Sequence, residues 1–456
     1  MSITNAFISS RSGLAATAAW SEVTSNNIAN ADRADYVRRG ILLTSGPTGA
    51  GVQVEGLRRE VDGALDRMHR QEMSRTATQD AIADGLKVHA ALLGEPGDPL
   101  SIQGRISALQ SRLDELSNDP AQPGLQRAAL DAAASVASTL NTTSGRLTET
   151  AVNTREGIVS DLSMLNRLLS ETAEINRQIT LREPGTRDSA ALEDTLAAKL
   201  DEMAQIVDLR VQRQPDGGIV IYTAGGTPLL EGRNVNTVTF SAADGRLFAG
   251  DAEITPGVPG ARGFEDGRLA GRIALLNDVL PRMQTQLDEA ARMLVESFTS
   301  ADTTLTPGDP GLFTDDGAAF DPLAASGLAA RITINEGVRG PGGDTLGRMR
   351  DGIGATAPGP QSDSTRIEAM IGSFSTVYAL SPEAGLGAQG RLSDFVPAMI
   401  ADQKVSYGSA QNRAESLRAG AQVLETTRLG FQGVNIDDEL QQLMAAAQAE
   451  LGKERA

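Results

Sequence analysis

Histidine and cysteine, two residue types that often perform catalysis or bind metals, are scarce in this chain of 456 residues. Its two histidines, His69 and His89, lack the i, i+4 spacing with which a helix presents a zinc-binding pair. It has no cysteine, which excludes disulfides, thiolate metal sites and cysteine nucleophiles. We interpret both histidines as incidental residues at the surface or on a helix face, and we expect no metal site.

Two short acidic stretches could in principle hold a cation, but they fit local backbone roles better. Residues 435–439, NIDDE, lack the alternating ligands and central glycine of a calcium loop. Acidic residues stabilise the first turn of a helix, so this stretch predicts a helix start capped by Asn435 or Asp437. Residues 314–317, TDDG, predict a turn. Nothing singles out a catalytic pair among the abundant carboxylates, so we expect no catalytic residues.

The glycine-rich stretches lack the features of a phosphate-binding loop. Residues 45–51 (SGPTGAG) and 339–347 (RGPGGDTLG) have no Gly-Lys-Ser/Thr ending, and neither joins a clear buried strand to a helix. A Gly-x-Ser-x-Gly nucleophile elbow is also missing. The sequence therefore predicts a protein without an enzymatic activity and without a cofactor.

Composition excludes further classes of partner. The formal net charge is −18, so nucleic acid and acidic membrane surfaces are poor partners for the chain as a whole. No stretch approaches the roughly 20 apolar residues of a membrane span. The N-terminal stretch has no basic leader, and Arg11 interrupts its apolar residues. We expect a protein that stays inside the cell or leaves it by a route that cleaves no signal peptide.

The apolar spacing predicts long helices. Ile102, Ile106, Leu109, Leu113 and Leu116 follow one helical face, with Pro99 near the start and Pro120 after the end. The other helices are expected at residues 3–30, 61–93, 123–181, 189–207, 267–298, 364–430 (in two tracts) and from 435 to the end of the chain. Residues 36–59 predict extended chain with turns, and residues 208–266 predict β-hairpins.

These elements predict a mainly α fold with a small β domain inserted in the middle. The terminal helices are expected to pair as an α-helical coiled coil, and the long helices to form a bundle. The expected domains are terminal assembly segments at 1–60 and 431–456, a helical body at 61–207, 267–299 and 363–430, a β insertion at 208–266, and a Gly/Pro-rich loop region at 300–362, whose residues 339–360 we expect to be a mobile loop.

Two arginine pairs flank the extended segment: Arg38 with Arg39, and Arg58 with Arg59. In a chain this acidic, they predict either ion pairs with a neighbouring subunit or a solvated face.

The stretch LAATAAWSEVTSNNIANADRADYVRRG, residues 14–40, resembles the N-terminal signature of the flagellar axial proteins, which build the rod, the hook and the hook–filament junction. In that family an Ala-rich helix ends in Asn-Asn-Ile-Ala-Asn and leads into a Tyr-x-Arg segment. The matching residues here are Asn26, Asn27, Ile28, Ala29, Asn30, Tyr36 and Arg38. One departure is that Arg33-Ala34-Asp35 stands where the family usually has Thr-Pro-Gly.

Further stretches resemble the hook-associated protein 1 family within that class. They are GVNIDDELQQLM (433–444), GRLAGRIALLNDVLPRMQTQLDEAARML (267–294) and GTPLLEG (226–232). The family's C-terminal helix continues for several turns through a Gln-x-Ala-Tyr stretch, which AAAQAELGKERA (445–456) does not match. We therefore expect a shortened C-terminal helix here.

The resemblance implies an adaptor subunit at the hook–filament junction, which polymerises on the distal hook and templates attachment of the next junction protein and the filament. The implied partners are copies of itself, the hook protein below, a second hook-associated junction protein above, the export apparatus and an export chaperone that binds the C-terminal region. The implied location is the bacterial flagellum, outside the cell, reached through the flagellar secretion channel without a cleaved signal peptide.

Three alternatives remain open. Another axial protein, of the hook or rod, should have more β structure than the helical tracts at 100–207 allow. An exported cell-wall hydrolase would need a catalytic constellation. A generic coiled-coil scaffold would need heptads that Gly and Pro do not interrupt so often.

Each terminal helix carries a thin apolar stripe that it can bury only against the other helix or a neighbouring subunit. NNIAN would close the first helix and place residues 36–59 between subunits. The residues expected at this assembly interface are Ile3, Phe7, Leu14, Trp20, Val23, Asn26, Asn27, Ile28, Asn30, Tyr36, Arg38, Val434, Asn435, Ile436, Leu440, Leu443 and Met444.

Because these stripes are thin, both terminal helices should be loosely ordered in the free monomer and should fold on assembly. Hydrogen exchange of the monomer should then show fast exchange over residues 3–30 and from 435 onward. Full protection of both segments in the monomer would contradict this account.

Overall fold

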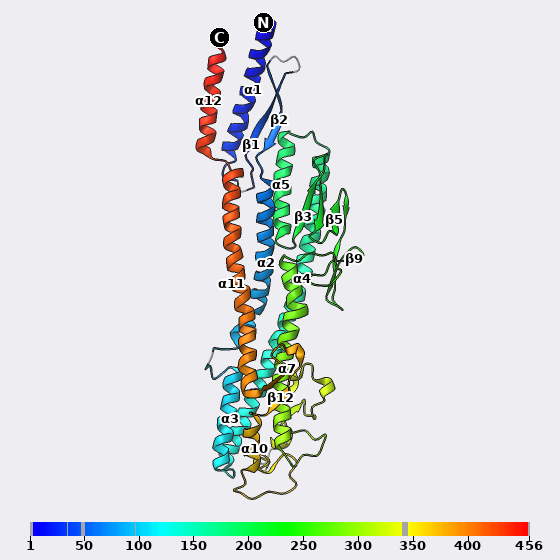
Figure 1. The fold of residues 1–456 in the computed structure, drawn as a ribbon, viewed down its shortest axis with the longest axis vertical. Coiled ribbons are helices and arrows are strands. Elements are labelled where there is room, and N and C mark those ends of the chain that lie inside the picture. Colours follow the sequence, from blue (N-terminus) through cyan, green and yellow to red (C-terminus); the bar gives the residue numbers. More distant parts are fainter. Residues whose placement is uncertain (1–2, 34, 47–50, 96, 340–344, 455–456) are drawn as a thin grey trace. The chain divides into compact units, whose positions relative to one another are not determined.

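The computed structural model describes residues 3–33, 35–46, 51–95, 97–339 and 345–454, with side chains from residue 7 to residue 450 within these ranges. Long helices dominate, as expected for a mainly α fold (Figure 1). The helices are α1 (Ile3–Ala29), α2 (Gly63–Leu92), α3 (Ile102–Asn118), α4 (Pro123–Thr180), α5 (Arg187–Ala204), α6 (Arg268–Ala274), α7 (Leu280–Ala301), α8 (Leu328–Arg331), α9 (Arg348–Asp351), α10 (Thr365–Ser373), α11 (Leu392–Gln432) and α12 (Ile436–Glu454).

The strands form small antiparallel sheets. The hairpin of β1 (Arg39–Ser45) and β2 (Val52–Arg59) follows α1. The β insertion holds a sheet of β3 (Leu209–Arg213), β4 (Ile219–Thr223), β5 (Pro228–Glu231) and β6 (Asn234–Val235), and a sheet of β7 (Val238–Ser241), β8 (Arg246–Ala249) and β9 (Ala252–Glu253). Two further hairpins pair β10 (Phe313–Asp315) with β11 (Ile332–Ile334), and β12 (Val377–Ala379) with β13 (Gln389–Arg391).

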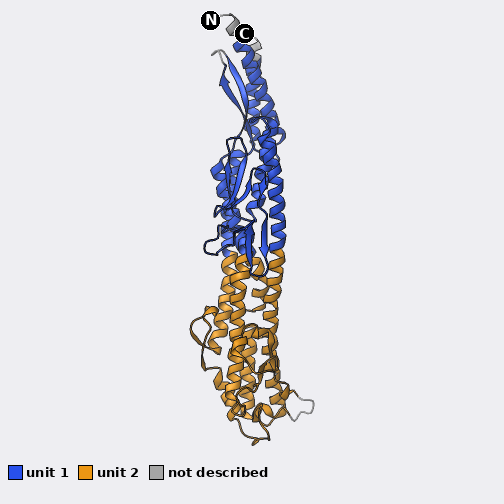
Figure 2. Cartoon of the chain, turned by 90° about the vertical axis from the view of Figure 1, so that its right-hand side faces the viewer, with its two compact units in different colours: residues 1–81, 158–271, 412–456 blue, residues 82–157, 272–411 orange. Residues whose placement is uncertain are grey.

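The chain divides into two compact units, which Figure 2 distinguishes by colour. Unit 1 comprises residues 1–81, 158–271 and 412–456, and unit 2 comprises residues 82–157 and 272–411. Among the described helices, none combines the length and the hydropathy that a membrane-spanning segment requires.

Polar side chains cap the N-terminal ends of three helices. The Ser101 hydroxyl accepts the Gly104 N–H at 3.0 Å, and Thr186 accepts the Ser189 N–H at 3.2 Å. Asn435, one of the two expected caps, accepts the Asp437 N–H at 3.0 Å and so starts α12. NIDDE therefore starts a helix, as predicted.

The core of unit 2 gathers around α3, α7 and α10. All five apolar residues that predicted α3 are buried, which confirms the helical period. Phe298 on α7 packs edge to face against Phe313 and Phe374, with ring centroids 4.9 and 5.8 Å apart. This aromatic cluster joins three separate segments.

Residues 300–362, predicted as a Gly/Pro-rich loop region, contain β10, α8, β11 and α9, whose apolar side chains enter this core. The predicted turn at 314–317 is confirmed, because Asp316 and Gly317 have positive φ angles and Thr314 Oγ1 accepts the Gly317 N–H. The centre of the predicted mobile loop, residues 340–344, lies outside the described residues.

The helix predicted over 267–298 contains an irregular turn. A π-helical turn, Leu275–Val279, separates α6 from α7. Pro281 follows at once and cannot donate a backbone hydrogen bond to the preceding turn, which accounts for the altered pattern there.

Two asparagines attach the β sheets of unit 1 to α4. Asn176 donates to the Ile219 carbonyl and accepts the Ile219 N–H, at 3.0 and 2.7 Å. Asn166 makes the same pair of bonds to Val238, at 2.9 and 2.8 Å. Each side-chain amide thus takes the place of a peptide group in the ladder, at one strand of each sheet.

The β1–β2 hairpin contacts the turn between α4 and α5. The Leu57 N–H donates to the Gly185 carbonyl at 2.7 Å, and a Cβ on Gly56 would lie 3.0 Å from that carbonyl oxygen. Glycine at position 56 therefore permits the close approach, and Gly185, with φ of 78°, takes a conformation that favours glycine.

Asp208, just before β3, is a half-buried acid with a raised pKa. Burial, and then the neighbouring Asp266 carboxylate, raise the pKa of Asp208 to about 6. The Glu265 N–H donates to Asp208 at 3.3 Å. Because the folded pKa lies above the unfolded value of about 3.9, the stability that this group contributes is complete below that value and is lost as the pH rises through about 6.

Replacing Asp208 by Asn should therefore stabilise the protein at pH 8 relative to pH 4. The expected change in the stability difference between variant and parent over this range is roughly 1 to 3 kcal/mol. Denaturant unfolding at both pH values measures it, with the exposed Asp251→Asn as the matched control. Parallel pH profiles for D208N and the parent would refute the assignment.

Candidate functional site at the joint of the terminal helices

The joint lies where α1 ends and α12 begins. Figure 1 shows α1 and α12 side by side, with the β1–β2 hairpin against α1, and these elements are in contact. The asparagine-rich motif closes α1 as predicted: the backbone N–H and the side-chain amide of Asn30 both donate to the Asn26 carbonyl. The Asn26 amide donates back to Glu22.

Asn27 is the centre of the joint. It is 1% exposed, and its amide uses both donors and two acceptor positions. The amide nitrogen donates to the Arg39 carbonyl at 2.9 Å and to Glu439 Oε2 at 3.0 Å. The amide oxygen accepts the Tyr36 hydroxyl at 2.9 Å and the Arg39 N–H at 3.1 Å. A single side chain thus connects α1, the segment before β1, and α12.

Glu439 carries the C-terminal side of the joint. Its carboxylate is buried and accepts Arg38 Nε at 2.6 Å in addition to the Asn27 amide. The Arg38 N–H donates to the Gln432 carbonyl, at the end of α11, at 2.8 Å. A buried carboxylate is stable only when it is paired and hydrogen-bonded, so α12 depends on the N-terminal segment for this partner.

A buried ion cluster extends the joint to α5. Asp194 accepts Arg39 at 3.0 Å and Arg59 at 2.8 Å, and Arg59 also pairs with Glu193 at 3.3 Å. The Arg39 guanidinium lies 4.8 Å from the centroid of the Tyr36 ring. Burial raises the pKa of Asp194, and the two guanidiniums oppose that rise.

These contacts correct one expectation. Arg38, Arg39 and Arg59 form ion pairs within the chain, where a neighbouring subunit or a solvated face was expected. Their partners are buried carboxylates of α12 and α5. Only Arg58 of these four is exposed, and it pairs with Glu60.

Both histidines are buried, which corrects the expectation of a surface position, although both do lie on a helix face of α2. His69 Nε2 lies 3.3 Å from Glu425, and burial, then the Arg428 charge, lower its pKa. His89 Nε2 lies 2.7 Å from Gln403 Oε1, and burial lowers its pKa. Within the part of the chain that the structure describes, no three His, Asp or Glu side chains gather as metal ligands.

The structure divides the predicted interface residues into three groups. Buried are Val23, Asn27 and Tyr36. Half-buried are Leu14, Asn26, Ile28, Asn30, Arg38, Val434 and Leu443. Exposed are Phe7, Trp20, Asn435, Ile436, Leu440 and Met444. The side chain of Ile3 lies outside the described residues.

The sequence analysis missed the acids of α5. Asp194 and Asp201 lie seven residues apart and so share one helical face. Asp201 accepts Arg70 at 2.6 Å and Arg428 at 2.8 Å. Two acids at heptad spacing beside the apolar stripe were the available signal. Their arginine partners lie more than 100 residues away in sequence, so the sequence alone could not identify them.

Comparison with known proteins shows what the chain as a whole is similar to. Residues 90–305 match the model of the flagellar hook-associated protein FlgK helical domain. A relative from Bacillus subtilis, flagellar hook-associated protein 1, is 22% identical, and the alignment covers 94% of this chain and 91% of the relative. Over most of its length, the chain is therefore similar to flagellar hook-associated protein 1.

Other members align over less of their length. Flagellar hook-associated protein 1 of Salmonella typhimurium is 24% identical over 64% of this chain, and the match spans 55% of that relative. A solved structure of the flagellar hook junction protein FlgK from Burkholderia pseudomallei matches 54% of this chain and 46% of its own, with a TM-score of 0.44 and 19% identity.

Replacing Asn27 by Asp should loosen α12 from α1. The change removes the donor to Glu439 and brings two carboxylates together, which should cost roughly 2 to 4 kcal/mol of docking free energy. Hydrogen exchange over α12 in the assembled protein measures the loss, which should shrink at low pH as one carboxyl becomes protonated. Asn26→Asp, which changes only a local bond to Glu22, is the control. Equal protection in both variants would show that Asn27 does not hold α12.

Proposed function

We propose that this chain is a structural adaptor subunit at the hook–filament junction, and that it assembles through the exposed faces of its terminal helices. The family supports a structural role in the flagellum. One observation carries the proposal: the joint fixes α1 beside α12 but leaves an apolar stripe of α12 without a partner.

That stripe consists of Ile436, Leu440 and Met444, at i, i+4 and i+8, which are 44%, 43% and 59% exposed. Among the described side chains of α12, those of Glu439 and Ala446 are buried, and they lie on another face. These three residues are among those that the sequence analysis assigned to the assembly interface. Their side chains are exposed on α12 and can contact another subunit.

Other exposed apolar residues lie on neighbouring elements of unit 1. They are Phe7, Ile8 and Trp20 on α1, and Val423, Leu429 and Phe431 on α11. Exposed apolar surface of this kind marks an interaction site, since leaving it in water forgoes the free energy of burial. Packing against the same elements of further copies would bury it and would yield a polymer.

In this proposal, residues 1–60 and 431–456 are the assembly segments. The exposed residues Phe7, Trp20, Ile436, Leu440 and Met444 contact neighbouring subunits, while Val23, Asn27, Tyr36 and Arg38 hold the joint that presents them. Ordering of the terminal helices is completed when copies meet, which keeps the acidic monomer soluble beforehand.

The proposed partners are copies of this chain, the hook protein below and a second hook-associated junction protein above. The subunit leaves the cell through the flagellar secretion channel without a cleaved signal peptide, with the aid of an export chaperone. The alternative function is that of a hook or rod subunit. Such a subunit would differ from a junction adaptor in the length of the polymer that it forms.

The test is to add purified protein to isolated hooks and to image the distal ends by electron microscopy. A short zone that saturates is the expected result. A long growing tube would assign the protein to the hook or filament instead. Absence of any addition would refute the proposal.

Leu440→Gln with Met444→Gln should abolish the added zone, because glutamine preserves helix propensity but removes the apolar stripe. Occupancy at limiting concentration should fall by at least about tenfold, the effect of losing roughly 1.4 kcal/mol of apolar contact. Circular dichroism should remain unchanged. Val159→Gln, an equally exposed valine on α4, is the matched control. Normal zones from the double variant would remove this stripe from the interface.

A further inference from the structure

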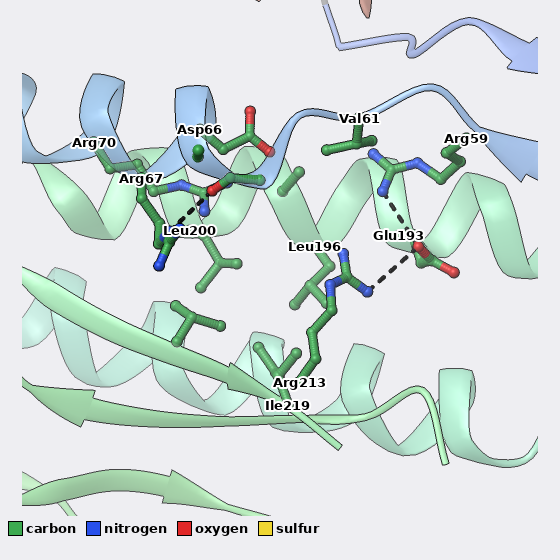
Figure 3. A pocket seen from close by; sticks show the side chains of 14 residues that line it. Arg59, Val61, Asp66, Arg67, Arg70, Glu193, Leu196, Leu200, Arg213 and Ile219 are labelled. Carbon is green, nitrogen blue, oxygen red and sulfur yellow. Dashed lines mark hydrogen bonds and ion pairs between the residues drawn. The ribbon is translucent and has the colours of Figure 1, made fainter. Parts of the chain in front are cut away.

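A groove in unit 1 runs between α2, α5 and the β3–β4 hairpin (Figure 3). Its central part is a cavity of about 380 Å³. It shares Arg67, Arg70 and Val211 with one adjoining hollow, and Arg59, Glu193 and Arg213 with another. The three hollows therefore form one continuous groove along α2.

The groove is basic, although the chain has 59 acidic and 41 basic residues. The charged residues that line it are Arg58, Arg59, Arg67, Arg70, Arg210 and Arg213, against Asp66, Glu193 and Asp208. This local excess of arginine is opposite in sign to the rest of the molecule.

Two of these arginines have no carboxylate partner among the described residues, although Arg67 Nε donates to the Gly63 carbonyl at 3.1 Å. Arg59 and Arg70 are buried in ion pairs with Asp194 and Asp201. Arg67 and Arg210, by contrast, are exposed and form no ion pair among the described residues. Arg213 is 59% exposed and lies 3.6 Å from Glu193. Guanidinium groups thus remain available at the rim for carboxylates.

The groove wall is apolar between these charges. Leu196 and Leu200 of α5, Val211 of β3 and Ile219 of β4 line it. Figure 3 shows Leu196, Leu200 and Ile219 between the arginines of α2 and Arg213. Such a surface fits a segment that combines carboxylates with an aliphatic side chain.

We propose that this groove binds the first turn of α12 from a second copy of the chain. The inference rests on the proposed self-assembly. In that turn, Ile436, Asp437 and Asp438 are consecutive and exposed. Neither aspartate forms an ion pair among the described residues. Their backbone N–H groups donate to the side-chain oxygen of the Asn435 cap.

The two surfaces are complementary in charge and in apolar character. Asp437 and Asp438 face free guanidiniums, and Ile436 faces the aliphatic wall. Glu439, the next residue, is already held inside its own joint by Arg38. The joint would therefore present the preceding acids to a neighbour. Contact between an acidic turn and a basic groove would also offset the repulsion between copies that each carry a formal charge of −18.

Because the chain has no cysteine, one introduced cysteine is a unique attachment point. Ala64→Cys, at an exposed position in the groove, would carry a benzophenone photocrosslinker. This protein would be mixed with a nitrogen-15 copy, added to hooks and irradiated, and adducts would be mapped by mass spectrometry. The expected adduct joins residue 64 to an isotope-labelled peptide from 431–445. Ala243→Cys, on an exposed turn, is the control.

Neutral variants test the charges. Asp437→Asn with Asp438→Asn, or Arg67→Gln with Arg210→Gln, should each lower the adduct yield about tenfold, and combining all four should lower it little further. Unchanged yields would overturn the charge recognition. Adducts to hook protein, to another segment, or none in hooks that carry a normal added zone would overturn this inference and leave the proposed function intact. Hooks without any added zone would refute both.

Discussion

Everything at the assembly end of unit 1 depends on one fully bonded amide. The Asn27 side chain has two donors and two acceptor positions in use, and its partners come from two separate stretches of the chain, residues 36–39 and α12. No other side chain of this size offers donors and acceptors in the same planar arrangement without a charge. A carboxylate there would repel Glu439, and an aliphatic residue would leave Glu439 and the Arg39 backbone without partners. The requirement for asparagine at this position follows from that geometry.

Three acidic side chains near this amide are each paired with arginines. Glu439 is neutralised by Arg38, Asp194 by Arg39 and Arg59, and Asp201 by Arg70 and Arg428. The acids lie on helices, and their arginine partners come from the segment around the β1–β2 hairpin, from α2 and from α11. Such buried pairs contribute little net stability relative to apolar packing, but they penalise strongly any arrangement in which one partner is missing. They therefore select one alignment of α5, α12 and the hairpin.

The sequence predicted local structure well and long-range pairing poorly. The period of α3, the capping by Asn435 and the turn at 314–317 follow from interactions within a few residues, and these predictions agree with the structure. Arg39 could not be assigned to Asp194, because that pairing depends on how α5 packs, 155 residues away. The surface alternative for the histidines failed for the same reason, because His69 on α2 lies beside Glu425 and Arg428 of α11, near the other end of the chain. Pro281 accounts for the π-helical turn before α7, because proline cannot donate a backbone hydrogen bond to the preceding turn. The sequence did not indicate at which residues the π-helical turn would form.

The two asparagines on α4 have a mechanical consequence. Asn166 and Asn176 are ten residues apart, which along a helix corresponds to about 15 Å. Each sheet is held at one of these two points, by a pair of hydrogen bonds from one amide. Force applied to the outer edge of either sheet would therefore enter the helix at that sheet's own asparagine, and the two loads would reach α4 at separate points. A change of length or sequence beyond those anchors, in the hairpin tips, would leave the mounting itself unaltered.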